Sequence, residues 1–492
     1  MTRPAATSLD ALGGVLRAAD LLLDTRNGVD VSVTGVCQDS RAVHPGDLFL
    51  AWAGTSVDAH DFVAGAVNDG AIAAVVERPL DLEIPQLVVR DGRRAAGLAA
   101  HFVMGSPDAD LLTVGVTGTN GKTTTAMLIR HLLDPSIPTA VIGTLGLIDR
   151  DGPRAGTTGL TTPGPVQVAV WLREMVDGGM GAVVMEASSH ALAQRRLDGM
   201  RIDIAVFTNL TQDHLDYHGD LGEYFAAKAR LVELVSPDGT VLVNESEPAW
   251  SALEVEGRTL RSFGLDGTAD VRASKLELDA RGARFDLSVD GETRHVETPL
   301  LGRYNVENAL AATAAALAAG IPLDAVVDRL RDAPQVTGRL EAIVTSPFTV
   351  LIDFAHTPDA LGSALAAVKP LTPGRLIVVF GAGGDRDRSK RRPMAEAVRA
   401  VADAIVLTSD NPRTEDPEVI LDDLAAGLQG AAYARISDRG DAIEHALSSA
   451  RPGDTVVLAG KGHETYQIVG TEKTPFDERE IVVACLTALE AN

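Results

Sequence analysis

Short apolar runs alternate with amphipathic stretches along most of the chain, and this alternation predicts an α/β protein. Within residues 1–106, short apolar strands alternate with helical patterns through the segments 31–40, 45–54 and 60–77. The Gly-Ser-Pro sequence at 105–107 is typical of a linker. We therefore expect a small α/β domain over residues 1–106.

A second unit is expected over residues 107–338. It begins with the strand-like run 111–117, and the apolar runs 181–188 and 202–210 predict further strands of one mainly parallel sheet. Between residues 240 and 300 the apolar positions change to short alternating runs, which favour an antiparallel insertion.

The remaining residues, 339–492, contain three apolar runs that are typical of buried strands, at 348–356, 375–384 and 454–462. Helical stretches separate these runs, so we expect a doubly wound, Rossmann-like domain. The whole chain of 492 residues is thus expected to form three α/β domains.

Composition narrows the possible functions. The chain is 45% hydrophobic and 23% charged, as globular proteins are, and its net charge of −24 argues against a nucleic-acid surface. It contains only two cysteines, so neither a disulfide framework nor a zinc cluster is indicated. No apolar run is long enough to span a membrane, and the first residues lack the apolar core of a signal peptide. These features predict a soluble, cytoplasmic protein.

The most informative stretch is GTNGKTT, residues 118–124, between the strand-like run 111–117 and a helical stretch. Glycines let the backbone approach a ligand, and the N–H groups of a helix start, together with Lys122, attract phosphate. The spacing is shorter than in the usual G-x-x-x-x-G-K-[ST] loop, and a strand–turn–helix with an unrelated lysine is the alternative. A nucleoside triphosphate site is the better interpretation.

Groups that suit a magnesium ion lie near this loop in the predicted sheet. Glu186 follows the apolar residues 181–185, and with the Thr123 hydroxyl it offers the oxygen ligands that Mg²⁺ prefers. Acids and two histidines crowd residues 213–218, and Lys228 follows on a predicted helix. A solvated acidic loop is the alternative for this stretch, whose spacing does not match a zinc site.

Lysine is scarce in this chain. Only seven of the 44 basic residues are lysines, and four of them, Lys122, Lys228, Lys390 and Lys461, lie in motif-like stretches. A lysine amine can lose its proton and react, whereas the guanidinium of arginine cannot. The uneven use of the two residues indicates positions at which an amine is needed.

Polar motifs follow four predicted strands near the C-terminus. They are DFAHTP at 353–358, GAGGDRDRSKRRPM at 381–394, DNPR at 410–413 and AGKGHE at 459–464. Ligands of open α/β sheets bind outside the carboxyl ends of the strands, so these motifs should meet in one pocket. Arginines beside carboxylates suit a zwitterionic amino acid.

With these motifs the chain resembles the ATP-dependent Mur ligases of peptidoglycan synthesis. The resemblance rests on GTNGKTT, MEASSH, NLTQDHLDYHG, GRYNVENALAA, DFAHTPDAL, GAGGDRD, DNPR and AGKGHE, and it extends to QDSRAVHPGDLFLAWAG near the N-terminus. Within the family the chain is most similar to the ligases that add the third amino acid. The resemblance implies three domains, which bind a uridine nucleotide, ATP and an amino acid.

The resemblance also implies the reaction. The substrates would be UDP-N-acetylmuramoyl-L-alanyl-D-glutamate, meso-diaminopimelate and ATP, the cofactor Mg²⁺, and the enzyme a monomer without nucleic-acid or membrane partners. Because a carboxylate is a poor electrophile, ATP would first phosphorylate it, and the amine would then attack the acyl phosphate.

The family pattern assigns roles to individual positions of this chain. The implied catalytic residues are Lys122, Glu186, His214 and Lys228, and the implied magnesium ligands are Thr123, Glu186, His214 and Lys228 as a carbamate. The implied ATP contacts are Gly118, Thr119, Asn120, Gly121, Lys122, Thr123, Thr124, Asn305, Asn308, Arg339 and Asp353. The implied UDP-muramoyl-peptide contacts are Gln38, Ser40, Thr55, Ser56, Val57, Thr161, Thr162, Ser188, Gln194 and Arg196. The implied amino-acid contacts are Arg391, Asp410, Asn411, Pro412, Arg413, Gly460 and Glu464.

Other functions share parts of this pattern. A lysine-adding or D-alanyl-D-alanine-adding ligase and folylpolyglutamate synthase have the same kind of phosphate loop, but DNPR and the N-terminal segment argue against them. A phosphate-loop switch or motor, which belongs to a different class, would not need four polar strand ends. ATP turnover that requires both a UDP-muramoyl dipeptide and an amino acid would separate the two classes.

Overall fold

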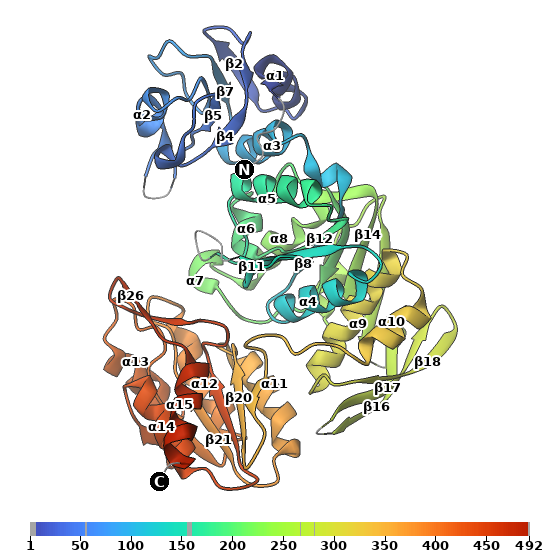
Figure 1. Ribbon diagram of the computed structural model, residues 1–492, viewed down its shortest axis with the longest axis vertical. Coiled ribbons are helices and arrows are strands. Elements are labelled where there is room, and N and C mark those ends of the chain that lie inside the picture. Colours follow the sequence, from blue (N-terminus) through green and yellow to red (C-terminus); the bar gives the residue numbers. More distant parts are fainter. Residues whose placement is uncertain (1–5, 55–56, 155–159, 266, 280, 491–492) are drawn as a thin grey trace.

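The computed structural model describes residues 6–54, 57–154, 160–265, 267–279 and 281–490 of the chain. It contains three main sheets that follow one another along an elongated molecule (Figure 1). Each of the three segments expected from the sequence contributes one of these sheets.

The N-terminal segment forms a five-stranded sheet with helices on both faces. Its elements are β1 Thr7–Ser8, α1 Leu9–Ala18, β2 Leu22–Arg26, β3 Ser32–Val33, β4 Gly35–Cys37, β5 Asp47–Leu50, α2 Val63–Asn68, β6 Ala73–Val76, β7 Gln86–Val89 and α3 Gly92–Val103. The strand order is β2-β7-β6-β5-β4, in which only β2 is antiparallel to its neighbour. α1 and α3 bury one face and α2 buries the other.

The central segment forms an eleven-stranded sheet that is also covered on both faces. Its elements are β8 Leu112–Thr117, α4 Lys122–Leu133, β9 Thr139–Gly143, β10 Gly146–Asp149, β11 Gly152–Arg154, α5 Pro165–Asp177, β12 Ala182–Glu186, α6 Ser189–Ala193, β13 Ile202–Phe207, α7 Leu215–His218, α8 Leu221–Ala229, β14 Val235–Asn244, β15 Thr259–Leu265, β16 Val271–Asp279, β17 Gly282–Val289, β18 Glu292–Thr298, α9 Arg303–Ala318 and α10 Leu323–Leu330. The strand order is β11-β10-β9-β12-β8-β13-β14-β15-β16-β17-β18. α4, α9 and α10 pack on one face, and α5 and α6 pack on the other.

The expected antiparallel insertion at 240–300 is wrong for its first half. β14 and β15 pair in parallel, β15 and β16 do so as well, and only β16, β17 and β18 are antiparallel. Alternating apolar positions indicate that one face of a strand is exposed, but they do not determine strand direction. In β14, Val241 and Leu242 belong to the two opposite cores of the central sheet. These strands therefore extend the central sheet instead of forming a separate unit.

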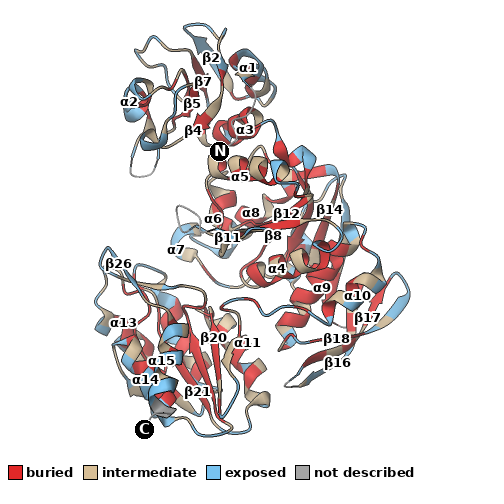
Figure 2. Cartoon of the chain, viewed as in Figure 1, coloured by how far each residue is buried: buried red, intermediate tan, exposed pale blue. Residues whose placement is uncertain are grey.

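The C-terminal segment is doubly wound, as predicted. Its elements are β19 Glu341–Val344, β20 Thr349–Asp353, α11 Pro358–Val368, β21 Leu376–Phe380, α12 Arg391–Arg399, β22 Ala404–Leu407, α13 Pro417–Ala425, β23 Ala434–Arg435, α14 Arg439–Ser449, β24 Thr455–Ala459, β25 Tyr466–Val469, β26 Glu472–Pro475 and α15 Glu478–Glu490. The sheet order is β19-β20-β24-β21-β22-β23, and only β19 is antiparallel. α11, α12 and α13 cover one face and α14 and α15 the other, so the inner strands are buried (Figure 2).

The first two segments meet at a seam where backbone touches backbone. A Cβ atom on Gly97 of α3 would lie 2.0 Å from the carbonyl oxygen of Asp198, and one on Gly199 would lie 2.8 Å from Gly97. Next to this contact, the backbone N–H of Arg201 donates to the Asp108 carboxylate at 3.0 Å. The seam therefore leaves no space for side chains at these two glycines.

Candidate active site

The phosphate loop lies between β8 and α4, where the sequence predicted it. Gly118 and Gly121 have φ of 147° and 85°, a region that favours glycine. A Cβ on Gly118 would lie 1.9 Å from the Thr208 hydroxyl, and one on Gly121 would lie 2.4 Å from the Asn308 side-chain oxygen. No side chain caps the N-terminus of α4, so its first N–H groups are available to an anion.

Lys122 and Thr123 begin α4 and face different partners. The Lys122 ammonium donates to the carbonyl oxygens of Gly118 and Thr119, at 3.0 and 2.8 Å, and burial lowers its pKa. The Thr123 hydroxyl donates to the Glu186 carboxylate at 2.9 Å. The positive end of α4 and the lysine thus concentrate positive charge at the loop.

The residues around Thr123 fit a magnesium ion. Glu186 is 1% exposed, stands at the end of β12 and also accepts hydrogen bonds from the backbone and the hydroxyl of Thr144. The side-chain atoms of Thr123 and Glu186 that could bind a metal ion are all oxygens. Mg²⁺ usually binds one or two carboxylates and completes its coordination shell with water and phosphate oxygens. Across the described residues, no three or more histidine, cysteine, aspartate or glutamate side chains converge on a single point, as a protein cage for a metal would require.

The acidic loop after β13 brings Asp213 and His214 to the same region. Burial alone would raise the pKa of Asp213, but the charges of His356, His214 and Lys390 hold it at about 2. Burial lowers the pKa of His214 to about 3, so its imidazole is neutral at physiological pH. A carboxylate and a neutral imidazole therefore lie side by side.

Lys228 of α8 is buried beneath the phosphate loop. Its side chain is 1% exposed, its amine donates to the Gly118 carbonyl oxygen at 2.6 Å, and it lies 4.3 Å from the centre of the Tyr224 ring. Burial lowers the pKa of Lys228 well below its ordinary value, and the nearby charge of Lys122 lowers it further. A lowered pKa increases the fraction of the amine that is uncharged, and only an uncharged amine reacts with carbon dioxide.

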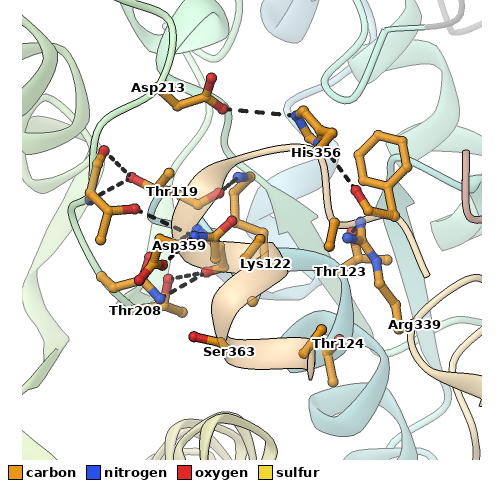
Figure 3. A pocket seen from close by; sticks show the side chains of 18 of the residues that line it. Thr119, Lys122, Thr123, Thr124, Thr208, Asp213, Arg339, His356, Asp359 and Ser363 are labelled. Carbon is orange, nitrogen blue, oxygen red and sulfur yellow. Dashed lines mark hydrogen bonds and ion pairs between the residues drawn. The ribbon is translucent and has the colours of Figure 1, made fainter. Parts of the chain in front are cut away.

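A cavity of about 570 Å³ joins the phosphate loop to the C-terminal segment, a volume that suits a small-molecule ligand. Figure 3 shows Lys122 and Thr123 in the same pocket as Arg339, His356 and Asp359. The predicted site residues that line the cavity are Thr119, Asn120, Gly121, Lys122, Thr123, Thr124, Thr161, Glu186, His214, Asn308, Arg339, Asp353, Asp410, Asn411, Arg413, Gly460 and Glu464.

Direct contacts join the central and C-terminal segments beside the cavity. The Asn120 amide donates to the Asp359 carboxylate at 3.0 Å. The Asp213 carboxylate lies 3.7 Å from the Lys390 ammonium and 3.9 Å from the His356 ring. Three side chains of the C-terminal segment thus approach the nucleotide-binding half of the site.

Arg339 reaches the phosphate loop, whereas Asp353 supports the chain around it. The Arg339 guanidinium donates to the Thr123 hydroxyl at 3.0 Å and stacks 4.7 Å from the centre of the Phe354 ring. The two carboxylate oxygens of Asp353 accept backbone N–H groups of Leu340 and Ala355, at 2.6 and 2.7 Å. Asp353 thereby fixes the loop that carries Arg339.

Asn305 and Asn308 lie together on α9, behind the phosphate loop. The Asn308 amide donates to the Asn305 side-chain oxygen at 3.1 Å, and both residues are buried. Asn305 lines a small hollow beside the main cavity together with Thr124, Leu301 and other residues. The two amides thus lie beyond the loop and beside the cavity, and their contact with ATP stays a prediction.

Four of the predicted muramoyl-peptide residues form one hydrogen-bonded group. The Thr162 hydroxyl lies 3.1 Å from that of Ser188, and the Thr162 carbonyl oxygen accepts from Arg196 at 2.8 Å. Arg196 in turn donates to the Gln194 side-chain oxygen at 2.7 Å. A Cβ on Gly164 would lie 2.8 Å from the Gln38 amide, so the N-terminal segment touches the same loop.

The remaining predicted uridine contacts are less well placed. Thr55 and Ser56 lie outside the described residues, and the Val57 side chain is 57% exposed. Ser40 begins a single 3-10 turn and is partly exposed. Among these positions, Gln38 has the clearest binding feature, because its side-chain oxygen is buried without a hydrogen-bond partner.

The predicted amino-acid pocket lies at the ends of β22 and β24. Arg413 has φ of 52°, and its guanidinium donates to the Gly384 carbonyl oxygen at 2.8 Å. The Asn411 amide donates to the Glu464 carboxylate at 2.8 Å. A Cβ on Gly460 would lie 2.4 Å from an oxygen of Asp410, so glycine is needed there. Pro412 is buried, and its carbonyl oxygen lies against the glycine-rich loop after β21.

The structure does not bring Arg391 into this cavity. Its side chain is 1% exposed, and its guanidinium donates to the carboxylates of Asp423 and Glu415, each at 2.8 Å. The first turn of α12 directs the side chain toward α13, and no sequence signal distinguishes this direction from the opposite one. Two basic residues that the sequence analysis did not assign, Arg386 and Lys390, line the cavity wall instead.

This ion pair leads to a prediction about pH. The hydrogen bond from Arg391 holds the pKa of Glu415 at about 2, below its ordinary 4.5. Because the folded-state pKa is lowered, the stabilisation is complete above pH 4.5 and is lost as the pH falls toward 2. Glu415→Gln should lower the free energy of unfolding by roughly 1–3 kcal/mol at pH 7 and by less at pH 3.5.

Urea unfolding of the wild type and the variant at both pH values measures this difference. The exposed Glu472 provides the control, because Glu472→Gln should leave stability unchanged at either pH. An equal loss at pH 7 and pH 3.5 for Glu415→Gln would show that its arginine partners, Arg391 and Arg388, do not hold this carboxylate ionised.

None of the helices in the described part of the chain has the length and hydrophobicity that crossing a membrane requires.

Three family models match the chain: the Mur ligase family catalytic domain at residues 32–103, the Mur ligase middle domain at 116–316 and the Mur ligase glutamate ligase domain at 338–462.

Curated relatives and solved structures are similar over nearly the whole chain. The UDP-N-acetylmuramoyl-L-alanyl-D-glutamate–2,6-diaminopimelate ligase of Thermosynechococcus vestitus is 44% identical and covers 91% of this chain and 92% of its own length. The enzyme of the same name from Bacillus velezensis is 39% identical, with 94% and 95% covered. A solved structure of a ligase of that name is 34% identical, with a TM-score of 0.70 and 99% of each chain covered. A Thermotoga maritima MurF ligase in complex with ADP shares the fold, at 17% identity, a TM-score of 0.67 and 93% and 98% covered.

Proposed function

The chain belongs to the Mur ligase family and is an ATP-dependent ligase, and from this premise we propose that it joins meso-2,6-diaminopimelate to UDP-N-acetylmuramoyl-L-alanyl-D-glutamate. The bond formed is an amide between the side-chain carboxylate of the D-glutamyl residue and an amino group of diaminopimelate. ATP is converted to ADP and phosphate. We place the reaction in the cytoplasm, as a step of peptidoglycan precursor synthesis.

One observation supports this assignment most directly. A single cavity contains the phosphate loop at one end and the pocket of Arg413 and Glu464 at the other. A ligase needs this arrangement, because the carboxylate must be activated by ATP within reach of the incoming amine. A nucleotide-dependent switch has no use for an amino-acid pocket, which is why we set that alternative aside.

In the first step, a carboxylate oxygen of the substrate attacks the γ-phosphorus of ATP, and the bond to the ADP oxygen breaks. The α4 N-terminus, Lys122 and Arg339 stabilise the negative charge that builds up during this transfer. Lys122 then exchanges its present contacts with the Gly118 and Thr119 carbonyl oxygens for phosphate oxygens. The product is an acyl phosphate.

In the second step, the amine attacks the acyl carbon and gives up a proton to a neighbouring base or to water. The tetrahedral intermediate then expels phosphate and leaves the amide. The Thr162, Ser188, Gln194 and Arg196 group would hold the muramoyl peptide so that its carboxylate reaches the loop.

Thr123 and Glu186 would hold Mg²⁺, with His214 and a carbamate of Lys228 at a second position. Bound Mg²⁺ supplies positive charge that neutralises the phosphate oxygens of ATP. The chain's own contribution is to orient the oxygens of Thr123 and Glu186, which are already in contact.

The main alternative is a ligase that adds lysine or another diamino acid. The names of the curated relatives and the position of Arg413 favour diaminopimelate. Ligation assays with meso-diaminopimelate, lysine and ornithine would distinguish these substrates, and only the first should support rapid amide formation.

The acyl-phosphate route predicts where an oxygen atom goes. With ¹⁸O in the substrate's glutamyl carboxylate, one labelled oxygen should appear in the released phosphate for each amide formed, because the carboxylate oxygen becomes the bridging atom. Mass spectrometry of phosphate and ADP measures this transfer. A reaction without the amino acid is the control and should release no labelled phosphate beyond slow hydrolysis. Label in ADP, or in neither product, would rule this mechanism out.

A further inference from the structure

We propose that Arg439, which does not line the cavity, is a positioning residue that sets the distance between the two loops of the amino-acid pocket at their starts, whereas the hydrogen bond from Asn411 to Glu464 joins them further along. The proposal rests on the proposed function and adds a determinant of its affinity for the diamino acid. Arg439 begins α14, and its side chain is among the largest that are fully buried in the described part of the chain.

The guanidinium of Arg439 contacts the backbone of both loops. One terminal nitrogen donates to the Ser409 carbonyl oxygen at 3.2 Å, and the other donates to that of Ala459 at 2.9 Å. Ser409 directly precedes the DNPR motif, and Ala459 directly precedes Gly460. A single planar group with five fixed donors thus holds the start of each substrate-binding loop.

The sheet does not impose this distance by itself. β22 and β24 are not neighbours, because β21 lies between them in the strand order. The ladders of β21 with β22 and with β24 space the two strands, but they end before Ser409 and Ala459, where the two loops start. Arg439 spans the end of β21 and connects the two loops directly.

A buried glutamate compensates the charge of this arginine. Glu478 begins α15 and accepts from Arg439 at 2.8 Å, and both side chains are 0% exposed. α14 and α15 lie side by side on the face of the sheet opposite α11 (Figure 1). Apolar residues of the same size usually replace such a buried pair without loss of stability, so stability alone does not explain it. The hydrogen bonds from Arg439 to the two loops give this buried ion pair a positioning role.

The two loops provide different parts of the substrate site. The β22 loop contributes Asn411 and Arg413, and the β24 loop contributes Gly460 and Glu464. An amino acid with a charged group at each end must reach both loops at once, so an error in their distance affects its binding more than that of ATP. A displacement of about 1 Å can cost up to about a hundredfold in such a site.

The test compares Arg439→Met with a matched change at the other end of the same sheet. Arg439→Met should raise the KM for meso-diaminopimelate by about tenfold to a hundredfold and leave the KM for ATP unchanged. Arg375 forms the control: its guanidinium pairs with Asp454 at 2.7 Å, beside the amino end of β24. Arg375→Met should lower the melting temperature and leave both KM values unchanged.

A double variant separates positioning from stability. Arg439→Met leaves Glu478 buried without a partner, and adding Glu478→Leu removes that charge. The double variant should regain the thermal stability of the wild type and keep the high KM for meso-diaminopimelate. Arg439→Lys, which can reach only one of the two carbonyl oxygens well, should give an intermediate KM.

Two results would overturn the proposal. One is a double variant that recovers both its stability and a normal KM for meso-diaminopimelate. The other is an Arg439→Met variant whose KM for ATP rises as much as that for the amino acid. A wild-type protein that ligates no diamino acid would instead contradict the proposed function, so the two failures are distinguishable.

Discussion

Replacing Lys228 with alanine should reduce ligation by roughly 10²–10³-fold or more, because the site loses a carbamate whose negatively charged oxygens would hold Mg²⁺ beside the transferred phosphate. The unmodified lysine is a poor source of such charge. Its amine is buried against the Gly118 carbonyl oxygen, and burial lowers its pKa well below the ordinary value. An uncharged amine can add carbon dioxide and release a proton, which converts it into a carbamate with two oxygen ligands. A guanidinium cannot undergo this reaction.

Two measurements test this expectation. Wild-type protein equilibrated with ¹³C-bicarbonate should show a carbamate signal by NMR, and Lys228→Ala should not. Acetate or formate should restore part of the variant's activity by supplying carboxylate oxygens, whereas chloride at the same ionic strength should not.

Further variants exclude a purely structural role for this lysine. Lys228→Gln keeps a donor for the Gly118 carbonyl oxygen but cannot be carbamylated, so it should be as inactive as the alanine variant. Lys369→Ala removes a partly exposed lysine that pairs with Asp403, and it should leave the rate unchanged. Full activity in Lys228→Arg would show that no carbamate is needed.

Replacing Arg413 with alanine should abolish the preference for meso-diaminopimelate over lysine. Diaminopimelate has a second carboxylate at the far end of its side chain, and a guanidinium can bind it through two hydrogen bonds. Lysine lacks that carboxylate and leaves the partly buried arginine with the Gly384 carbonyl oxygen but without an ionic partner in the substrate. Losing one partner of a buried charge pair costs roughly 3–5 kcal/mol, which is a discrimination of about a hundredfold to a few thousandfold.

The backbone at Arg413 makes this a clean substitution. The residue has φ of 52°, its N–H donates to Ile468, and its carbonyl oxygen accepts from Gly470. Alanine has the same difficulty as arginine with this conformation and keeps both backbone hydrogen bonds, so the variant removes only the side-chain contacts.

Measuring kcat/KM for both amino acids, and the KM for ATP, completes the test. The value for meso-diaminopimelate should fall and the KM for ATP should stay unchanged. Arg392→Ala, which removes an exposed arginine on the same domain, is the control and should alter neither. An Arg413→Ala variant that still prefers meso-diaminopimelate would show that Arg413 does not bind the second carboxylate.

The parts of the site that could be predicted from sequence are those set by local rules. The glycines and Lys122 of the phosphate loop follow from the geometry of a helix start, and Glu186 follows from the end of a buried strand. The four polar strand ends of the C-terminal segment meet because parallel strands end at the same edge of a sheet. The periodicity of apolar residues and the positions of the strand ends were therefore sufficient to predict the phosphate loop with Glu186 and the meeting of the four polar strand ends.

The parts that could not be predicted depend on direction and partner. Arg391 and Arg413 both belong to motifs that follow strands, but the first contacts two carboxylates, of α13 and of its preceding loop, and the second lines the cavity. The parallel pairing of β14 and β15 depends on the direction in which the chain enters β15 after the connection from β14. The alternation of apolar residues contains no information about this direction. Arg439 has no motif, because two of its partners are backbone carbonyl oxygens that any sequence could supply and the third, Glu478, lies 39 residues further along the chain.

The glycine contact at the seam between the first two segments limits how this chain can be recombined with its relatives. Residues 1–106 look like an exchangeable module, but α3 presents Gly97 to the 198–199 turn at a distance that admits no Cβ on either side. A chimera that takes its first hundred residues from another ligase would keep its fold only if the donor also has glycine at the position of Gly97. Otherwise the turn around Gly199 would have to be transplanted with it. In such a chimera, residues 1–106 and the 198–199 turn must therefore be exchanged together, although they are far apart in the sequence.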